Sequence, residues 1–114
     1  MRARAVRRLP RAGLAAVLLL PLAPAPGRAD PALDLGRKVF VELADPHCGL
    51  CHALADAGTT GQVGPALDGL KPDAARVKAA VVNGIGVMPA FEDLSPEQVE
   101  AVAHYVATVA GRAR

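Results

Sequence analysis

The stretch Cys48-Gly49-Leu50-Cys51-His52 is the most informative part of this sequence. Its C-x-x-C-H spacing is the attachment signature of a covalently bound haem. Two thiols three positions apart can each add to a vinyl group at the haem edge, and the following histidine then lies under the iron and can supply an imidazole nitrogen. The motif therefore predicts one haem c, with iron, held by Cys48, Cys51 and His52.

The cysteine pair has three alternative interpretations. A redox-active dithiol in an exported protein belongs in a βαβ setting, and this sequence shows no alternating strand pattern. A zinc site would combine the two thiolates with two further ligands, for which His47, His52 and His104 are available. A structural disulfide across so short a loop would add little stability, because the stabilisation grows with loop length.

Met88 is the candidate for the second axial ligand, since Met/His is one of the standard haem pairings. It lies in Gly86-Val87-Met88-Pro89-Ala90-Phe91, a segment that predicts a loop and not a helical stripe. Pro89 confines the backbone of Met88 to extended forms, which could hold its thioether in one direction. The alternatives are a Met88 that only fills the core and a His/His-ligated haem that uses His104.

Residues 1–29 have the features of a secretory signal peptide. The first eleven residues include five arginines and no acid, the run Gly13 to Leu20 is apolar, and Gly27-Arg28-Ala29 provides the small residues that a signal peptidase reads. The apolar run is too short to cross a bilayer comfortably. We therefore expect a Sec-type signal, a periplasmic protein with no integral membrane span after cleavage, and one domain over 30–114. An uncleaved amphipathic anchor is the alternative.

Removing the signal reverses the charge of the chain. Residues 30–114 retain seven Lys and Arg against all eleven Asp and Glu, a formal charge of −4. No basic patch remains, so nucleic acid is excluded as an expected partner. A domain this small usually needs a staple such as a metal or a cofactor, which agrees with the haem motif.

Helical patterns account for most of the remaining sequence. Ser95, Pro96 and Gln98 form a capping box with proline at the first helical position, which predicts the start of the last helix. The other expected elements are a first helix over 34–44, a partly helical segment over 48–57, a glycine-rich loop over 58–69, a helix over 73–83 and a loop over 85–94. The predicted fold class is all-α, with three or four helices.

Residues 33–110 resemble the class I c-type cytochromes in the order of their motifs. A helix with Gly36 and Phe40 comes first, the haem motif and Gly64-Pro65-Ala66-Leu67 follow, and the Met88-Pro89 loop precedes a helix with Tyr105. The resemblance implies a compact cytochrome c fold wrapped around one haem, with the first and last helices crossing beside Gly36. It also implies that the Pro65 carbonyl binds the free ring nitrogen of His52, and that Met88 is the second iron ligand.

A haem with His and Met ligands has no open coordination position. We therefore expect an electron carrier and not an enzyme, a monomer that meets a donor and an acceptor redox protein through small transient interfaces. The segment 55–65 is similar to small cytochromes that accept electrons from periplasmic molybdenum dehydrogenases, sulfite-oxidising ones among them. A tightly bound haem subunit of such a sulfite-dehydrogenase-type complex is the first alternative, and a ligand-binding or peroxidase-type haem protein is the second.

Overall fold

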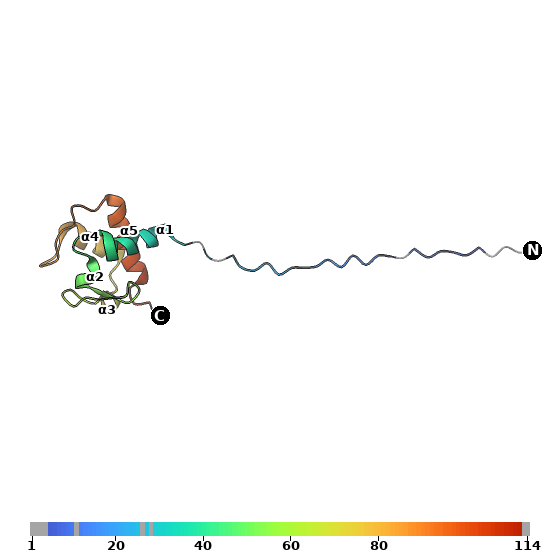
Figure 1. Cartoon of the computed structure of the whole chain (residues 1–114), viewed down its shortest axis with the longest axis horizontal. Helices are drawn as coiled ribbons and strands as arrows, with labels where there is room; N and C mark the ends of the chain where they lie inside the picture. The colour runs from blue at the N-terminus through green and yellow to red at the C-terminus, as the bar shows by residue number, and fades with distance from the viewer. Residues whose placement is uncertain (1–4, 11, 26, 28, 113–114) are drawn as a thin grey trace, which may run out of the picture.

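The computed structural model describes residues 5–10, 12–25, 27 and 29–112. A small folded unit begins near residue 30, and the N-terminal segment extends away from it (Figure 1). The helices are α1 (Pro31–Lys38), the π-helical turn η1 (Val39–Leu43), α2 (Cys48–Cys51), α3 (Leu67–Leu70), α4 (Ala74–Asn83) and α5 (Pro96–Val109). Two short strands, β1 (Ala53–Leu54) and β2 (Thr59–Thr60), lie between α2 and α3.

The crossing of α1 and α5 organises the core. A Cβ atom at Gly36 would collide with the Ala101 carbonyl oxygen and with the Tyr105 side chain, so only glycine allows this approach. Beside the crossing, the rings of Phe40 and Tyr105 meet edge to face, with centroids 6.1 Å apart and planes at 61°. Both rings are almost fully buried. The placement expected for Gly36, Phe40 and Tyr105 is thus present in the structure.

Three helices begin at side chains that cap them. The Ser95 and Gln98 capping box of α5 is present, and Asp73 accepts a hydrogen bond from the Arg76 N–H at the start of α4. The predicted start of the first helix was wrong. Asp30 caps α1 through the Ala32 N–H and Pro31 occupies its first turn, so the helix begins three residues before the expected 34.

The expectation of an all-α chain with three or four helices differs from the structure in two ways. Within the described residues there are five α-helices, because the four-residue α3 begins inside the segment expected to be a loop. β1 and β2 pair antiparallel, with Ala53 opposite Thr60 and Leu54 opposite Thr59. Strands of two residues are too short to produce an alternating pattern in the sequence.

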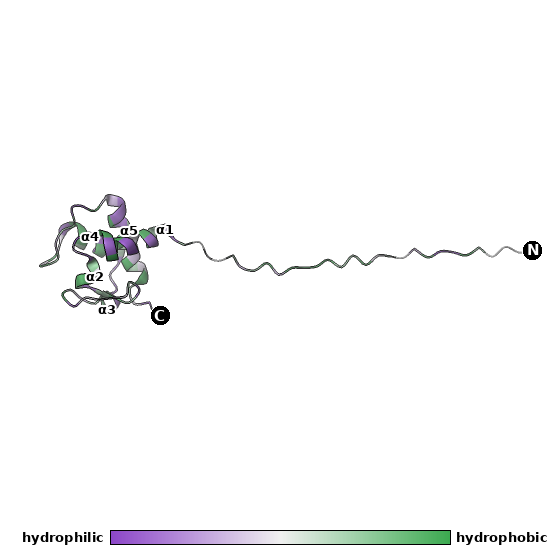
Figure 2. Cartoon of the chain, viewed as in Figure 1, coloured by the Kyte–Doolittle hydropathy of each residue, from purple (hydrophilic) through white to green (hydrophobic). Residues whose placement is uncertain are grey.

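The described part of the N-terminal segment has no regular secondary structure. Its apolar run, green in Figure 2, stays outside the folded domain, and Leu14 is 99% exposed. Among the residues that the structure describes, no helix is long and apolar enough to cross a membrane.

Candidate haem-binding site

The C-x-x-C-H motif forms one compact turn. Cys48–Cys51 is helical, the Leu50 N–H donates to the His47 carbonyl at 3.0 Å, and the His52 N–H donates to the Cys48 carbonyl at 2.9 Å. Both cysteines are free and half-buried. The turn brings Cys48, Cys51 and His52 together in the lining of one cavity.

The hairpin of β1 and β2 packs directly against this turn. A Cβ atom at Gly61 would lie 2.6 Å from the Cys51 carbonyl carbon, and one at Gly49 would collide with the Thr59 side chain. The Thr59 hydroxyl donates to the His52 carbonyl at 2.9 Å and accepts from the Leu54 N–H at 3.1 Å. The Thr59 hydroxyl therefore hydrogen-bonds two backbone groups, those of His52 and Leu54, and fixes the backbone where the chain leaves the motif.

The cavity has a volume of about 450 Å³, within the range of small-molecule and cofactor sites. Its lining residues come from η1, α2, α3, α4 and α5 and from the loops between them, and most of them are apolar. The apolar lining includes Phe40, Val63, Leu67, Leu70, Val77, Ala80, Val81, Ile85, Val87, Phe91, Val102 and Val106. Arg76 is the cationic side chain among the lining residues.

His52 is held in one tautomer. Its Nδ1 lies 2.8 Å from the Pro65 carbonyl oxygen, and because a carbonyl can only accept, Nδ1 must carry the proton. The lone pair is then on Nε2, the nitrogen free to bind a metal. Gly64 leaves room for the ring, since a Cβ atom there would lie 2.8 Å from Nδ1. The hydrogen bond expected between His52 and Pro65 is thus part of the structure.

Met88 lines the same cavity and packs against the buried core. Its backbone is fixed by paired hydrogen bonds with Ile85, with N–O distances of 2.9 and 3.0 Å. Gly86, with φ of 55°, makes the turn between them. Gly84 adds a close approach, because a Cβ atom there would lie 2.8 Å from the Met88 carbonyl oxygen. The loop is therefore tied to the end of α4.

The burial of Cys48 disfavours a redox dithiol. Burial raises the pKa of the Cys48 thiol to about 11. A redox dithiol needs an accessible thiolate with a lowered pKa. A thioether carries no charge and suits this apolar surrounding. Across the described residues, no three His, Cys, Asp or Glu side chains come together as a metal site.

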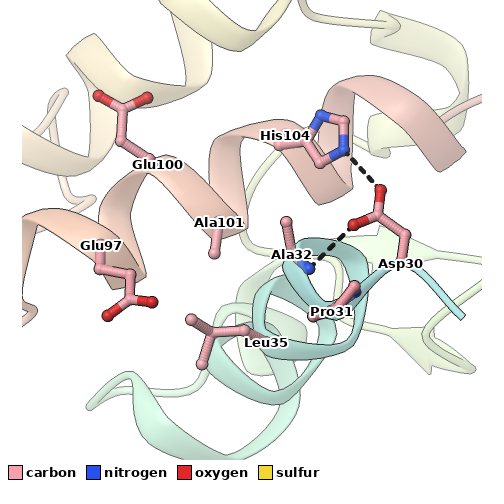
Figure 3. Close-up of a pocket in the computed structure, with 8 residues that line it drawn as sticks. All are labelled: Asp30, Pro31, Ala32, Leu35, Glu97, Glu100, Ala101 and His104. Atoms are coloured by element: carbon pink, nitrogen blue, oxygen red, sulfur yellow. Dashed lines mark hydrogen bonds and ion pairs between the residues drawn. The ribbon is translucent and has the colours of Figure 1, made fainter.

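His104 lies outside the cavity, in a separate hollow between α1 and the start of α5 (Figure 3). Its Nε2 is 3.2 Å from Asp30 Oδ2. That hydrogen bond, with a second from the Ala32 N–H, lowers the pKa of the Asp30 carboxyl. His47 is exposed, and its Nδ1 lies 2.7 Å from the Ala44 carbonyl oxygen. The structure therefore brings Met88, and not His104, into the cavity with His52.

The sequence-based reasoning missed several residues that shape this site. Thr59 and Gly49 act through contacts between the hairpin and the turn, and these contacts left no pattern in the sequence. Asp68 accepts hydrogen bonds from two distant backbone N–H groups, those of Ala55 and Gly111. Of the residues that surround His52, only Gly64 and Pro65 were indicated by the sequence, because a Gly-Pro pair marks a loop.

The donor set fits a covalently bound haem. Two half-buried thiols and an imidazole with its Nε2 lone pair free lie together on the lining of one large apolar cavity. In the described residues, every buried side-chain N or O atom has a hydrogen-bond partner. The described lining of the cavity therefore contains no unpaired buried polar side chain.

Comparison with known proteins agrees with this chemistry. Residues 31–106 match the family model described as cytochrome C oxidase, cbb3-type, subunit III. The crystal structure of the c-type cytochrome SorU from Sinorhizobium meliloti is 61% identical in sequence, with a TM-score of 0.71, over 72% of this chain and 94% of that chain. The comparison with curated proteins gave no match. Because the family model spans well over half of the chain, the chain belongs to this family of c-type cytochromes, electron-transfer proteins with covalently bound haem c.

Proposed function

We propose that this protein is a periplasmic one-electron carrier whose haem c is linked to Cys48 and Cys51 and ligated by His52 and Met88. The observation that carries the proposal is that His52 and Met88 line one apolar cavity, with the Nδ1 proton of His52 already committed to Pro65. When bound, the haem supplies a ferric/ferrous couple that gains or loses one electron.

The protein's own residues favour electron transfer over catalysis. Two side-chain ligands leave no coordination position for a substrate. Thioether ligation raises the reduction potential, and the apolar lining excludes water and disfavours the additional positive charge of the ferric state. Two backbone ties hold the Met88 loop, so little rearrangement accompanies a change of charge.

The mouth of the cavity is the expected place of electron exchange. Val63, Ile85 and Val87 line the cavity and are nevertheless 69%, 65% and 87% exposed. An apolar, exposed rim of this size suits a short-lived encounter with a redox partner, because such complexes bury small areas. We expect the chain to be a monomer between encounters.

Export of the chain is part of the proposal. Residues 1–29 would be removed as a secretory signal, leaving the domain over 30–114. The fold supports this division, because its first cap is Asp30 and the apolar leader side chains stay exposed.

A stable haem subunit of a larger oxidoreductase is the second candidate. The matching family model describes a subunit of an oxidase, and the segment 55–65 is similar to cytochromes that serve sulfite-dehydrogenase-type complexes. Purification of the tagged protein from the periplasm at moderate salt separates the two cases. A carrier elutes alone at the size of one domain, whereas a subunit elutes with stoichiometric partner chains.

Substitution of Met88 tests the axial ligand. In the oxidised protein we expect a weak near-infrared band from sulfur-to-iron charge transfer. Met88→Ala should abolish that band, lower the reduction potential, and allow rapid binding of cyanide or carbon monoxide. His104→Ala is the matched control and should change none of these, because His104 lies outside the cavity. Rapid ligand binding by the wild type would instead favour the ligand-binding or peroxidase-type alternative.

A further inference from the structure

Two hydrogen bonds join the segment of His52 to the segment of Pro65, and they are in matching register. Nδ1 of His52 lies 2.8 Å from the Pro65 carbonyl oxygen, and three residues further along both segments the Ala55 N–H donates to Asp68 Oδ2 at 2.8 Å. The other carboxylate oxygen, Oδ1, accepts from the Gly111 N–H at 2.9 Å. One half-buried carboxylate therefore connects the turn after β1, the helix after Pro65 and the chain after α5.

The Pro65 carbonyl depends on its neighbours for its position. Proline has no N–H of its own to anchor it, and Pro65 is exposed. On one side, the Gly64 N–H donates to the Cys51 carbonyl at 2.7 Å. On the other side stands the Asp68 link to Ala55. The first link is made by the backbone alone, so the second is the one that a side-chain substitution can remove.

Asp68 is itself firmly placed. It lies in α3, next to the buried Leu67. Its hydrogen bond to Gly111 is covered by the side chain of Lys71. The stem of Lys71 lies over Gly111, where an added Cβ atom would be 3.1 Å from Lys71 Cγ. Hydrogen bonds from backbone N–H groups to a carboxylate are about twice as strong as those to a neutral acceptor. The link therefore resists sliding of the two segments past each other.

We propose that Asp68 is a positioning residue for the axial imidazole: it keeps the Pro65 carbonyl at hydrogen-bonding distance from Nδ1 of His52. This inference rests on the proposed ligation of the iron by His52. A hydrogen bond from the outer ring nitrogen raises the basicity of a ligating histidine. Loosening it should weaken the ligand as a donor to the ferric iron and so raise the reduction potential.

Removal of a carboxylate charge would also raise the potential, so a second measurement is needed. Solvent exchange of the His52 Nδ1 proton, followed by NMR in the ferrous holoprotein, reports on the hydrogen bond itself. Asp68→Ala should speed this exchange about 2- to 10-fold, the range expected for loss of one net hydrogen bond, and raise the potential. Asp45→Asn is the matched control: it removes a carboxylate next to Pro46 of the cavity lining, and it should leave the exchange rate unchanged.

An unchanged exchange rate in a folded Asp68→Ala holoprotein overturns the inference. If that variant does not mature, Asp68→Asn takes its place, because an amide oxygen is a weaker acceptor than a carboxylate. It should still exchange faster than the wild type, and an unchanged rate counts against the inference equally. Failure of the proposed function looks different: the His52 ring protons of the wild type would then lack the upfield shift caused by a bound haem.

Discussion

A methyl group at Gly64 would strike the imidazole that we propose as an axial ligand. An ideal Cβ atom there lies 2.5 Å from Cε1 and 2.8 Å from Nδ1 of His52. Comfortable contacts of a carbon atom begin at about 3.5 Å, so the ring or the loop must retreat by about 1 Å. The ring has little freedom to do so, because Nδ1 is bound to Pro65 and the Thr59 hydroxyl holds the His52 carbonyl. Overpacking of this kind costs about 1–3 kcal/mol.

We therefore expect Gly64→Ala to lower the free energy of unfolding by about 2 kcal/mol and to shift the reduction potential, because the ligand geometry changes. Guanidinium denaturation followed by haem absorbance, together with a redox titration, measures both effects. Gly69→Ala is the control, since a Cβ atom there meets nothing within 4 Å. Alanine is favoured over glycine inside a helix by about 0.5–1 kcal/mol, so this variant should be as stable as the wild type or slightly more so. A Gly64→Ala protein with wild-type stability and potential would refute the reasoning.

Three further predictions concern stability. Gly36→Ala drives a methyl group into the backbone of α5, so it should lower the thermal midpoint more than any other glycine-to-alanine change in a helix, as calorimetry can show. Cys48→Ala with Cys51→Ala should give a largely unfolded chain by circular dichroism, because the apolar lining of the cavity of about 450 Å³ would lose the haem that covers it, and a small domain has a total stability of only about 5–15 kcal/mol; a cooperative melt would contradict this. The pKa of Asp30 is lowered from its usual 3.8 by its hydrogen bond with His104. The ionised carboxylate therefore stabilises the fold above that pH, and this stabilisation is lost as the pH falls below it. The difference in melting temperature between wild type and Asp30→Asn should shrink in acid, and a constant difference would exclude a contribution from the Asp30–His104 hydrogen bond.

Sequence patterns predicted the parts of the fold that local chemistry determines. The capping box at Ser95 located the start of α5, and the helix expected over 73–83 is α4, Ala74–Asn83. The first helix begins earlier than expected because its cap is Asp30, which directly follows the expected cleavage point. The two-residue strands and α3 depend on packing against the haem motif, and segments so short carry no periodicity of their own.

The sequence predicted which side chains lie together at the candidate site, but it did not predict the contacts that support them. Cys48, Cys51 and His52 form a local motif, and the order of motifs implied Met88 and Pro65. The structure places all five along one cavity or in direct contact with its lining. The roles of Thr59 and Asp68 could not be predicted, because each depends on hydrogen bonds to backbone groups from other parts of the fold.

The crossing of α1 with α5 has a consequence for the order of assembly. α1 packs on α5 at Gly36, so its stable partner is the last helix of the domain to become available. The haem motif, by contrast, is closed by contacts within residues 47–61 and can form early. If the chain is exported N-terminus first, as we propose, its two thiols are accessible while the domain is still open. The contact between α1 and α5 forms late, because the entropic cost of loop closure grows with loop length. Haem attachment to the two thiols could therefore precede the packing of α1 against α5.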